Sequence, residues 1–122
     1  MTKNELIENW LSVFAKNVDG SLLRKHVTSY GNFLWHIFTW GNVSCYEGEE
    51  ARAKFNSLQE MNGIKFYGGY SKQIEGLSMV KKITAEEIDE DIGDDVYIVD
   101  VNFTWTYVRT HESDCGPYFC IM

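Results

Sequence analysis

His111 and Glu112 are the adjacent pair whose residue types come closest to catalytic chemistry. A histidine changes charge near neutral pH and a carboxylate beside it can orient the ring, so the pair has the groups of a general acid or base. Adjacent strand residues point to opposite faces, so the two side chains share a site only where a strand ends. We favour the competing interpretation, in which they close a strand end by hydrogen bonds to the backbone or to Arg109.

A second histidine, His36, lies inside the apolar run from Phe33 to Trp40. A core histidine with one hydrogen bond is more common in such a run than a metal ligand or a base. If His36 and His111 lie on neighbouring strands, their rings can converge in one site. The sequence leaves that convergence open.

The cysteines and glycines give little support for a cofactor. His111, Cys115 and Cys120 have the spacing H-x3-C-x4-C, which supplies three zinc ligands. The fourth would have to be Cys45, His26 or an acid elsewhere, and no Cys-x2-Cys pair strengthens the site. The glycines form no Walker loop, dinucleotide fingerprint or Gly-x-Ser-x-Gly elbow. We therefore predict no metal, no cofactor and a protein that is not an enzyme.

A cluster of acids without any base lies between Glu86 and Asp95. Such a cluster is usually a solvated face, but it also attracts a basic protein and raises the rate of association. It lacks the alternating spacing and the glycine of an EF-hand loop, which disfavours calcium. The candidate partner-binding residues are Glu86, Glu87, Asp89, Glu90, Asp91, Asp94, Asp95, His111 and Glu112.

The charge balance favours one class of partner. Eighteen acids against eleven bases give a formal charge of −7, which repels nucleic acid and attracts a basic protein domain. Mild acidity is also ordinary for soluble proteins. The three cysteines, the absence of a signal-like start and the absence of an apolar run of membrane-spanning length predict a cytoplasmic protein with reduced thiols. At 122 residues, we expect one domain over residues 1–122.

The elements that must position these residues begin with a helix over residues 4–18, which follows a capping box of Thr2 and Glu5. A short helix is expected over residues 22–29. The aromatic and β-branched run over residues 33–40 predicts a central strand that is buried on both faces.

Helical spacing returns over residues 47–58. Asn62-Gly63 predicts a turn, and residues 64–70 form the next expected strand. Thr84 and Glu87 match a second capping box, which predicts a short helix. This order of elements predicts an α+β fold, an antiparallel or mixed sheet of four to five strands with helices packed on one face.

The clearest strand pattern covers residues 97–107, where the odd positions are apolar or aromatic. A single strand from Tyr97 to Glu112 would be roughly 50 Å long at about 3.3 Å per residue, which is too long for so small a domain. We therefore predict a turn near residues 100–102, with the odd positions supplying one buried face. A last strand is expected over residues 118–121.

Six blocks of sequence carry a resemblance to a known family: Leu34-Trp-His-Ile-Phe38, Glu47-Gly-Glu-Glu-Ala-Arg-Ala-Lys-Phe55, Asp95-Val-Tyr-Ile-Val-Asp100, Phe103-Thr-Trp-Thr-Tyr-Val108, Thr110-His-Glu112 and Gly116-Pro-Tyr-Phe119. Together they resemble a family of small bacterial proteins that is known as a domain of unknown function. The resemblance covers about residues 5–120 and implies a single bacterial domain with no activity to carry over. Small acidic immunity proteins are of similar type, and this analogy assigns no residues.

These observations leave three functions open. The first is an acidic cytoplasmic protein-binding module, most simply an immunity or antitoxin-type inhibitor of a basic toxin domain. The second is a structural or regulatory protein that pairs with a second copy of itself, so both a monomer and a homodimer are considered. The third is a small enzyme that uses His111 with Glu112 or His36. Nucleic acid and membranes are not expected as partners.

Overall fold

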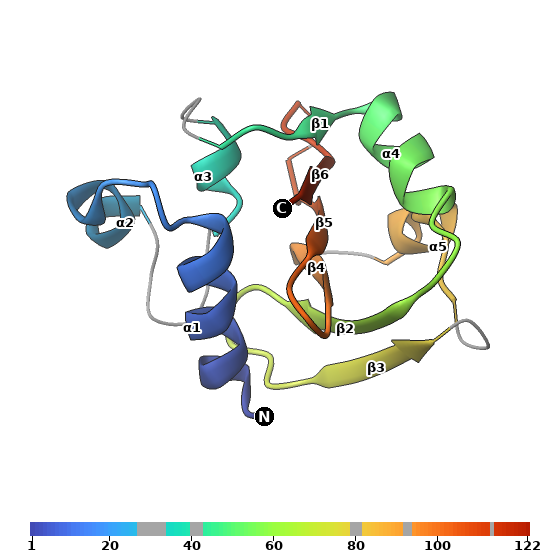
Figure 1. The fold of residues 1–122 in the computed structure, drawn as a ribbon, viewed down its shortest axis with the longest axis horizontal. Coiled ribbons are helices and arrows are strands. Elements are labelled where there is room, and N and C mark those ends of the chain that lie inside the picture. The colour runs from blue at the N-terminus through green and yellow to red at the C-terminus, as the bar shows by residue number, and fades with distance from the viewer. Residues whose placement is uncertain (27–33, 40–42, 79–81, 92–93, 113) are drawn as a thin grey trace.

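The computed structural model describes residues 1–26, 34–39, 43–78, 82–91, 94–112 and 114–122. This part of the chain forms helices and strands that alternate along the sequence (Figure 1). In order they are α1 (Lys3–Phe14), α2 (Gly20–His26), α3 (His36–Thr39), β1 (Tyr46–Glu47), α4 (Glu49–Asn56), β2 (Asn62–Tyr67), β3 (Ile74–Ser78), α5 (Ala85–Asp89), β4 (Val96–Asp100), β5 (Trp105–Arg109) and β6 (Tyr118–Ile121).

The six strands form one open sheet in the order β1-β6-β5-β4-β2-β3. Every neighbouring pair is antiparallel, which confirms the predicted α+β class. The sheet has more strands than the four to five expected because the sequence analysis missed the two edge strands, β1 and β3. β1 has only two residues and β3 is mostly exposed, so neither has the alternation that identifies a half-buried strand.

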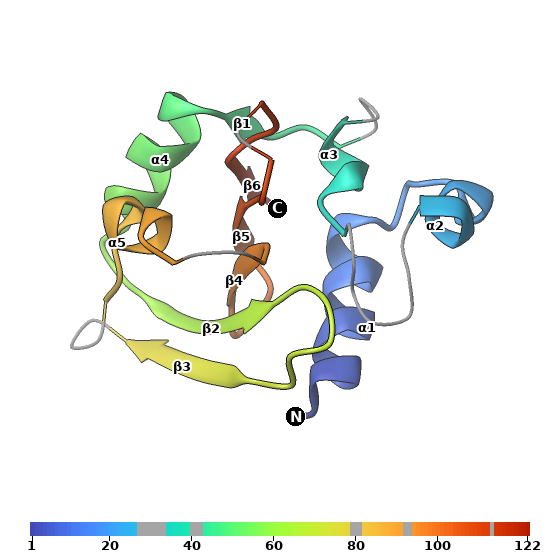
Figure 2. The ribbon, with the colours of Figure 1, turned by 180° about the vertical axis from the view of Figure 1, so that it is seen from behind.

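Helices cover both faces of the sheet, which corrects the expectation that they pack on one face. Figures 1 and 2 show α1 and α3 on one side of the central strands, and α4 and α5 on the other. We call these sides the α1 face and the α4 face. On the α1 face, Trp10 and Phe38 pack against Tyr97, and on the α4 face, Phe55 and Ile88 belong to the core that contains Ile98, Trp105 and Tyr107. 

The turn between β4 and β5 explains why both faces are apolar. Val99 pairs with Thr106 and Tyr97 pairs with Val108, so each odd residue lies opposite an even one. Odd-numbered residues therefore lie on the α1 face in β4 and on the α4 face in β5. Tyr97 contributes to the core of the α1 face, whereas Tyr107 contributes to that of the α4 face. The predicted turn is confirmed, but the prediction of one buried face for all odd positions was wrong.

The β4–β5 turn is held by the Asp100 carboxylate. Its Oδ2 accepts hydrogen bonds from the Thr104 hydroxyl at 2.7 Å and from the Asn102 N–H at 3.2 Å. The Phe103 N–H donates to the Asp100 carbonyl at 2.8 Å, with Phe103 in the left-handed region at φ 58°. A short acidic side chain that accepts from the backbone two residues later is a common way to stabilise such a turn.

Both predicted capping boxes are present. The Thr2 and Thr84 hydroxyls each accept from the backbone N–H three residues later, and Glu5 and Glu87 reach back to the capping residue. The first helix ends at Phe14, earlier than predicted. The second begins at Gly20, and residues 27–29 of its predicted span lie outside the described residues.

Two local predictions were wrong. The predicted strand over residues 33–40 instead contains α3, with Phe38 N–H donating to the Trp35 carbonyl at 3.0 Å; residues 33 and 40 lie outside the described part. Aromatic composition alone did not distinguish a buried helical turn from a strand. The predicted turn at Asn62-Gly63 instead begins β2, where a Cβ on Gly63 would lie 3.2 Å from the Val99 carbonyl oxygen. Glycine there permits the close approach of two strands.

We expect Trp105→Ala to lower the free energy of unfolding by about 3 to 5 kcal/mol, because the ring is 8% exposed and stacks on Phe119 with centroids 5.9 Å apart. Chemical denaturation measures the loss. Ile121→Ala, which truncates a side chain that is 58% exposed on the neighbouring strand, should cost about 1 kcal/mol or less. Equal losses for the two variants would contradict this placement of Trp105.

Candidate functional site

The open end of the β4–β5 hairpin brings the predicted site residues together. Val96 pairs with Arg109, so the acidic segment before β4 and the His111-Glu112 segment after β5 leave the sheet side by side. The sequence separates these segments by the whole hairpin. Antiparallel pairing removes that separation.

Asp95 is the buried centre of this end. Its side chain is 6% exposed, and Oδ2 accepts a hydrogen bond from the Trp35 indole Nε1 at 2.9 Å. Oδ1 accepts from the His111 backbone N–H at 2.7 Å and lies 2.7 Å from His111 Nδ1. Buried carboxylates persist in proteins when hydrogen bonds replace their water shell. Asp95 is therefore a structural group rather than part of a solvated acidic face.

Asp95, rather than Glu112, is the carboxylate in close contact with His111. Glu112 Oε1 lies 3.7 Å from His111 Nε2, outside hydrogen-bond distance. His111 is partly exposed, with 37% of its side chain accessible. The residue types of a general acid or base are thus present, in an arrangement that adjacency in the sequence did not predict.

The rings of His36 and His111 both contact the ring of Trp35. The centroid of the Trp35 ring lies 4.2 Å from that of His36 and 6.1 Å from that of His111. His36 belongs to α3 rather than to a strand neighbouring β5, and it is half-buried. Both histidine rings therefore contact Trp35, although His36 is not on a strand beside His111.

The Arg109 side chain positions the acidic segment by donating hydrogen bonds to that segment's backbone carbonyls. Its Nη1 donates to the Asp91 carbonyl at 2.7 Å and its Nη2 donates to the Asp94 carbonyl at 3.1 Å. We had considered Arg109 as a hydrogen-bond partner of His111 or Glu112. Among the hydrogen bonds and ion pairs of the described residues, none joins Arg109 to either of them. The guanidinium instead positions the chain that leads into β4.

Asp91 is paired rather than available. Its Oδ2 accepts from the Tyr67 hydroxyl at 2.7 Å and from Lys65 Nζ at 3.0 Å. Burial alone would raise the pKa of Asp91, but these hydrogen bonds outweigh it and hold the pKa below its ordinary value. The Asp91 carboxylate therefore stabilises the folded state at neutral pH, and this contribution is lost as the pH falls through the lowered pKa.

Arg52 organises the acids of the two helices on the α4 face. Its guanidinium pairs with Asp89, with Glu86 at 3.4 Å and with Glu49 at 3.5 Å. Asn56 Nδ2 also donates to the Glu86 carboxylate at 3.2 Å. We call the carboxylates of α4, α5 and the residue that follows α5 the α4–α5 acidic surface: Glu49, Glu50, Glu86, Glu87, Asp89 and Glu90.

The α4–α5 acidic surface carries more negative charge than its bases neutralise. These two helices contain two bases, Arg52 and Lys54, against the six carboxylates. Glu49 is 93% exposed and Glu86 is 63% exposed, so their charges face solvent. Glu87 is held in the capping box of α5. The predicted acidic cluster thus divides into the carboxylates of the α4–α5 acidic surface, the internally paired Asp91 and Asp95, and the exposed Asp94.

A shallow cavity of about 180 Å³ connects this surface to the hairpin's open end. Asp89 and Glu112 both line it, together with Arg109, Thr110 and the 115–117 segment. Burial, followed by the charges of Glu112, Asp114 and Glu47, raises the pKa of Cys115 beside it. A neutral Cys115 thiol is favoured at this position because the surrounding charge is negative.

Sequence reasoning missed the residues that hold these acids in place. Trp35, Arg52 and Lys65 make the defining contacts from parts of the chain far from the acidic cluster. No local spacing marks such partners, because each contact depends on how the sheet and helices pack. The acidic residues themselves were identifiable from composition.

Among the described residues, no three His, Cys, Asp or Glu side chains come together in a group that could hold a metal ion. Within the same residues, no helix has both the length and the apolarity to cross a membrane.

The fold and the site define a small α+β protein with an exposed acidic helix pair beside a hairpin end that is held by a buried carboxylate. The chain belongs to the family described as domain of unknown function DUF4275, whose model matches residues 3–119. No curated protein and no solved structure matches the chain.

We expect Asp95→Asn to lower the free energy of unfolding by about 2 to 4 kcal/mol, because an amide cannot accept all the hydrogen bonds that the buried carboxylate accepts. Thermal and chemical denaturation measure the effect. Asp94→Asn is the matched control, since Asp94 is exposed and its change should cost less than about 0.5 kcal/mol. A loss for Asp95→Asn as small as that for Asp94→Asn would contradict the role of Asp95.

Proposed function

We propose that this protein is an acidic, cytoplasmic protein-binding module that masks a basic protein domain, as an immunity or antitoxin-type inhibitor does. The observation that carries this proposal is the α4–α5 acidic surface, where six carboxylates accompany two bases. Its opposite charge would attract a basic partner and increase the rate of encounter. The family match is consistent with this function and assigns none.

The surface is built to present charge without rearrangement. Arg52 draws Glu49, Glu86 and Asp89 together, and Asn56 Nδ2 holds Glu86 from a second side. Carboxylates that are already ordered lose less side-chain entropy when a partner binds. The exposed oxygens of these carboxylates are then available to lysine and arginine side chains of the partner.

The paired loop acids have a different role in this proposal. Asp91 and Asp95 are engaged with Lys65 and with Trp35 and His111, so they support the surface rather than contact the partner. Asp94 and Glu112 are exposed and extend the negative charge toward the hairpin end. We therefore propose that the predicted partner-binding residues other than Asp91 and Asp95 contact the partner.

The hypothesis of a small enzyme that uses His111 has less support. His111 contacts a buried carboxylate, which is the arrangement of an oriented acid or base. The cavity that Asp89 and Glu112 line does not include His111.

Binding to a basic domain tests the proposal. The proposal predicts that a neighbouring gene encodes a basic domain. That domain, purified, is the probe, and cytochrome c is a general basic control. We expect Glu90→Lys to weaken binding by about tenfold or more in calorimetry, and added salt to weaken wild-type binding. Glu8→Lys makes the same charge change on α1, on the other face of the sheet, and should leave the affinity within about twofold.

Two outcomes would overturn the proposal. One is that the neighbouring basic domain binds no more tightly than cytochrome c. The other is that Glu90→Lys and Glu8→Lys weaken binding equally, because net charge rather than the α4–α5 acidic surface would then control the interaction.

The outer edge of β3, with which no further described strand pairs, favours a second candidate, a protein that pairs with a second copy of itself. β3 is the last strand of the sheet on its side, Glu75 and Gly76 are exposed, and a Cβ on Gly76 would meet no atom within 4 Å. Unprotected edge strands pair readily with other strands. A self-pairing protein would show a dimer mass in light scattering.

Ile74→Lys tests the β3 edge directly, since Ile74 is 37% exposed on that strand. In the self-pairing case we expect a dimer mass for the wild type and a monomer mass for Ile74→Lys. Met122→Lys, at an exposed position outside β3, should leave the dimer mass unchanged. A monomer mass for the wild type at about 100 µM would exclude this candidate as a stable dimer.

A further inference from the structure

Cys45 immediately precedes β1, and Cys120 lies in β6, the strand with which β1 pairs. β1 pairs with β6 through Tyr46 opposite Phe119 and Glu47 opposite Tyr118. Continued one residue beyond β1, the same register would place Cys45 opposite Cys120. The sequence separation of the two cysteines concealed this relation.

The hydrogen-bond pattern defines the type of this position. Gly48 N–H donates to the Pro117 carbonyl at 2.9 Å, which makes that pair a hydrogen-bonded position in the same register. Hydrogen-bonded and non-hydrogen-bonded positions alternate in antiparallel strands, so the Cys45 and Cys120 position is non-hydrogen-bonded. Side chains approach most closely at such positions, where Cα atoms are about 4.5 Å apart. A disulfide requires Cα atoms about 4.4 to 6.8 Å apart, so the register meets this requirement.

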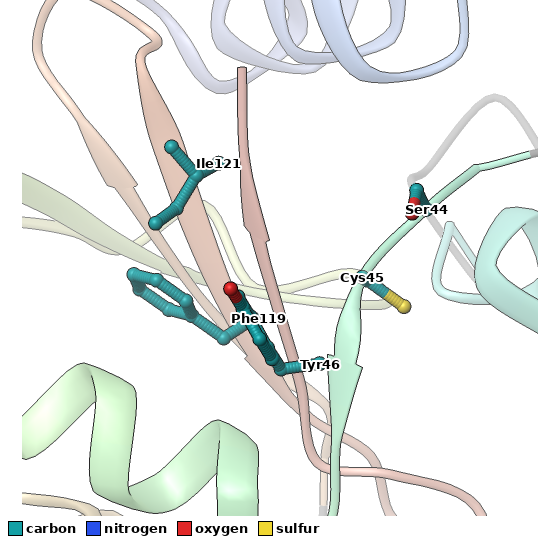
Figure 3. A pocket seen from close by; sticks show the side chains of 5 residues that line it. All are labelled: Ser44, Cys45, Tyr46, Phe119 and Ile121. Carbon is teal, nitrogen blue, oxygen red and sulfur yellow. The ribbon is translucent and has the colours of Figure 1, made fainter.

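Both thiols lie on the α1 face. Cys120 is fully buried in the core of that face, and Cys45 packs against the same core. Figure 3 shows the Cys45 sulfur on the side of its strand away from the Tyr46, Phe119 and Ile121 side chains. Cys120 Sγ lies 3.5 Å from the Ser44 carbonyl oxygen, so it reaches the segment that carries Cys45.

We propose that Cys45 and Cys120 are a thiol–disulfide exchange site that forms a reversible cross-strand disulfide with a small disulfide such as oxidised glutathione. The Cys45 thiol loses its proton, and its sulfur attacks the oxidant, which forms a mixed disulfide and releases one glutathione thiolate. The Cys120 thiolate then attacks the Cys45 sulfur and releases the second glutathione. The protein loses two hydrogen atoms, and one oxidised glutathione becomes two reduced molecules.

Burial slows this exchange, because it favours the protonated thiols. It raises the pKa of the Cys45 thiol to about 11, with smaller contributions from the charges of Cys120 and Glu47, and it also raises the pKa of Cys120. Because the thiolate is the attacking species, the rate increases about tenfold for each pH unit between about 7 and 10. The exchange is therefore slow near neutral pH and faster at alkaline pH.

The bond would cross-link the chain at the edge of the sheet. The chain enters β1 beside a cavity of about 280 Å³, which Ser44, Cys45, Tyr46, Phe119 and Ile121 line. A disulfide would link the residue that precedes β1 to β6. It would also close a covalent loop that contains most of the chain. We therefore expect the midpoint of thermal unfolding to rise by at least about 5 °C in the oxidised protein.

The test uses the full chain, reduced and then exposed to oxidised glutathione at pH 9. We expect the intact mass to fall by two hydrogen atoms, and non-reducing peptide mapping to join the peptides of Cys45 and Cys120. Cys115→Ser should form the same bond. Cys45→Ser and Cys120→Ser should not, and Cys120→Ser should stop at the glutathione adduct on Cys45.

A second preparation removes thiol burial as an obstacle. Reduced, unfolded protein is refolded in a buffer of oxidised and reduced glutathione, and its fold is checked by circular dichroism. A natively folded product that lacks the link between Cys45 and Cys120, or that links Cys115 instead, would overturn the proposal. Neither result would bear on the α4–α5 acidic surface, so the two proposals can fail separately.

Discussion

The buried carboxylate of Asp95 is the interaction on which the arrangement of the site depends. Removing a charged group from water is costly, and the cost is offset here because Trp35 and His111 together supply the hydrogen-bond donors. This bonding brings a residue before β4, a residue after β5 and a ring beside α3 into contact. The acidic segment and the His111 segment consequently have fixed positions relative to the sheet, and the exposed acids beside them have fixed positions as well.

The same hairpin requires the second helical layer. β4 is buried on both sides, and the four-residue connection to β5 places the odd-numbered residues of the two strands on opposite faces. α1 and α3 cover one side, while α4 and α5 cover the other. The α4–α5 acidic surface is therefore the solvent side of helices whose inner side the core of the sheet demands. Residues such as Phe55 serve packing, and Glu49 and Glu86 remain outside, where charge can serve recognition.

Local chemistry made much of the fold predictable. The capping boxes at Thr2 and Thr84 and the alternation around Tyr97 act within a few residues, and each identified an element that is present. The contacts of Asp95 and Arg52 could not be predicted, because Trp35 is 60 residues from Asp95 and Asp89 is 37 residues from Arg52. Adjacency suggested Glu112 as the partner of His111, whereas packing selected Asp95. Composition located the acids, and only the tertiary structure separated the paired ones from the exposed ones.

Hydrogen exchange of the Trp35 indole N–H measures the central contact directly. The donor is buried and bonded to Asp95 Oδ2, so NMR at neutral pH should show exchange at least about 100-fold slower than in an unfolded peptide. The Trp10 indole, which donates to the Thr106 hydroxyl at 2.9 Å on the α1 face, provides an internal reference for a protected ring. Protection of Trp10 together with exchange of Trp35 at the rate of an unfolded peptide would contradict the account.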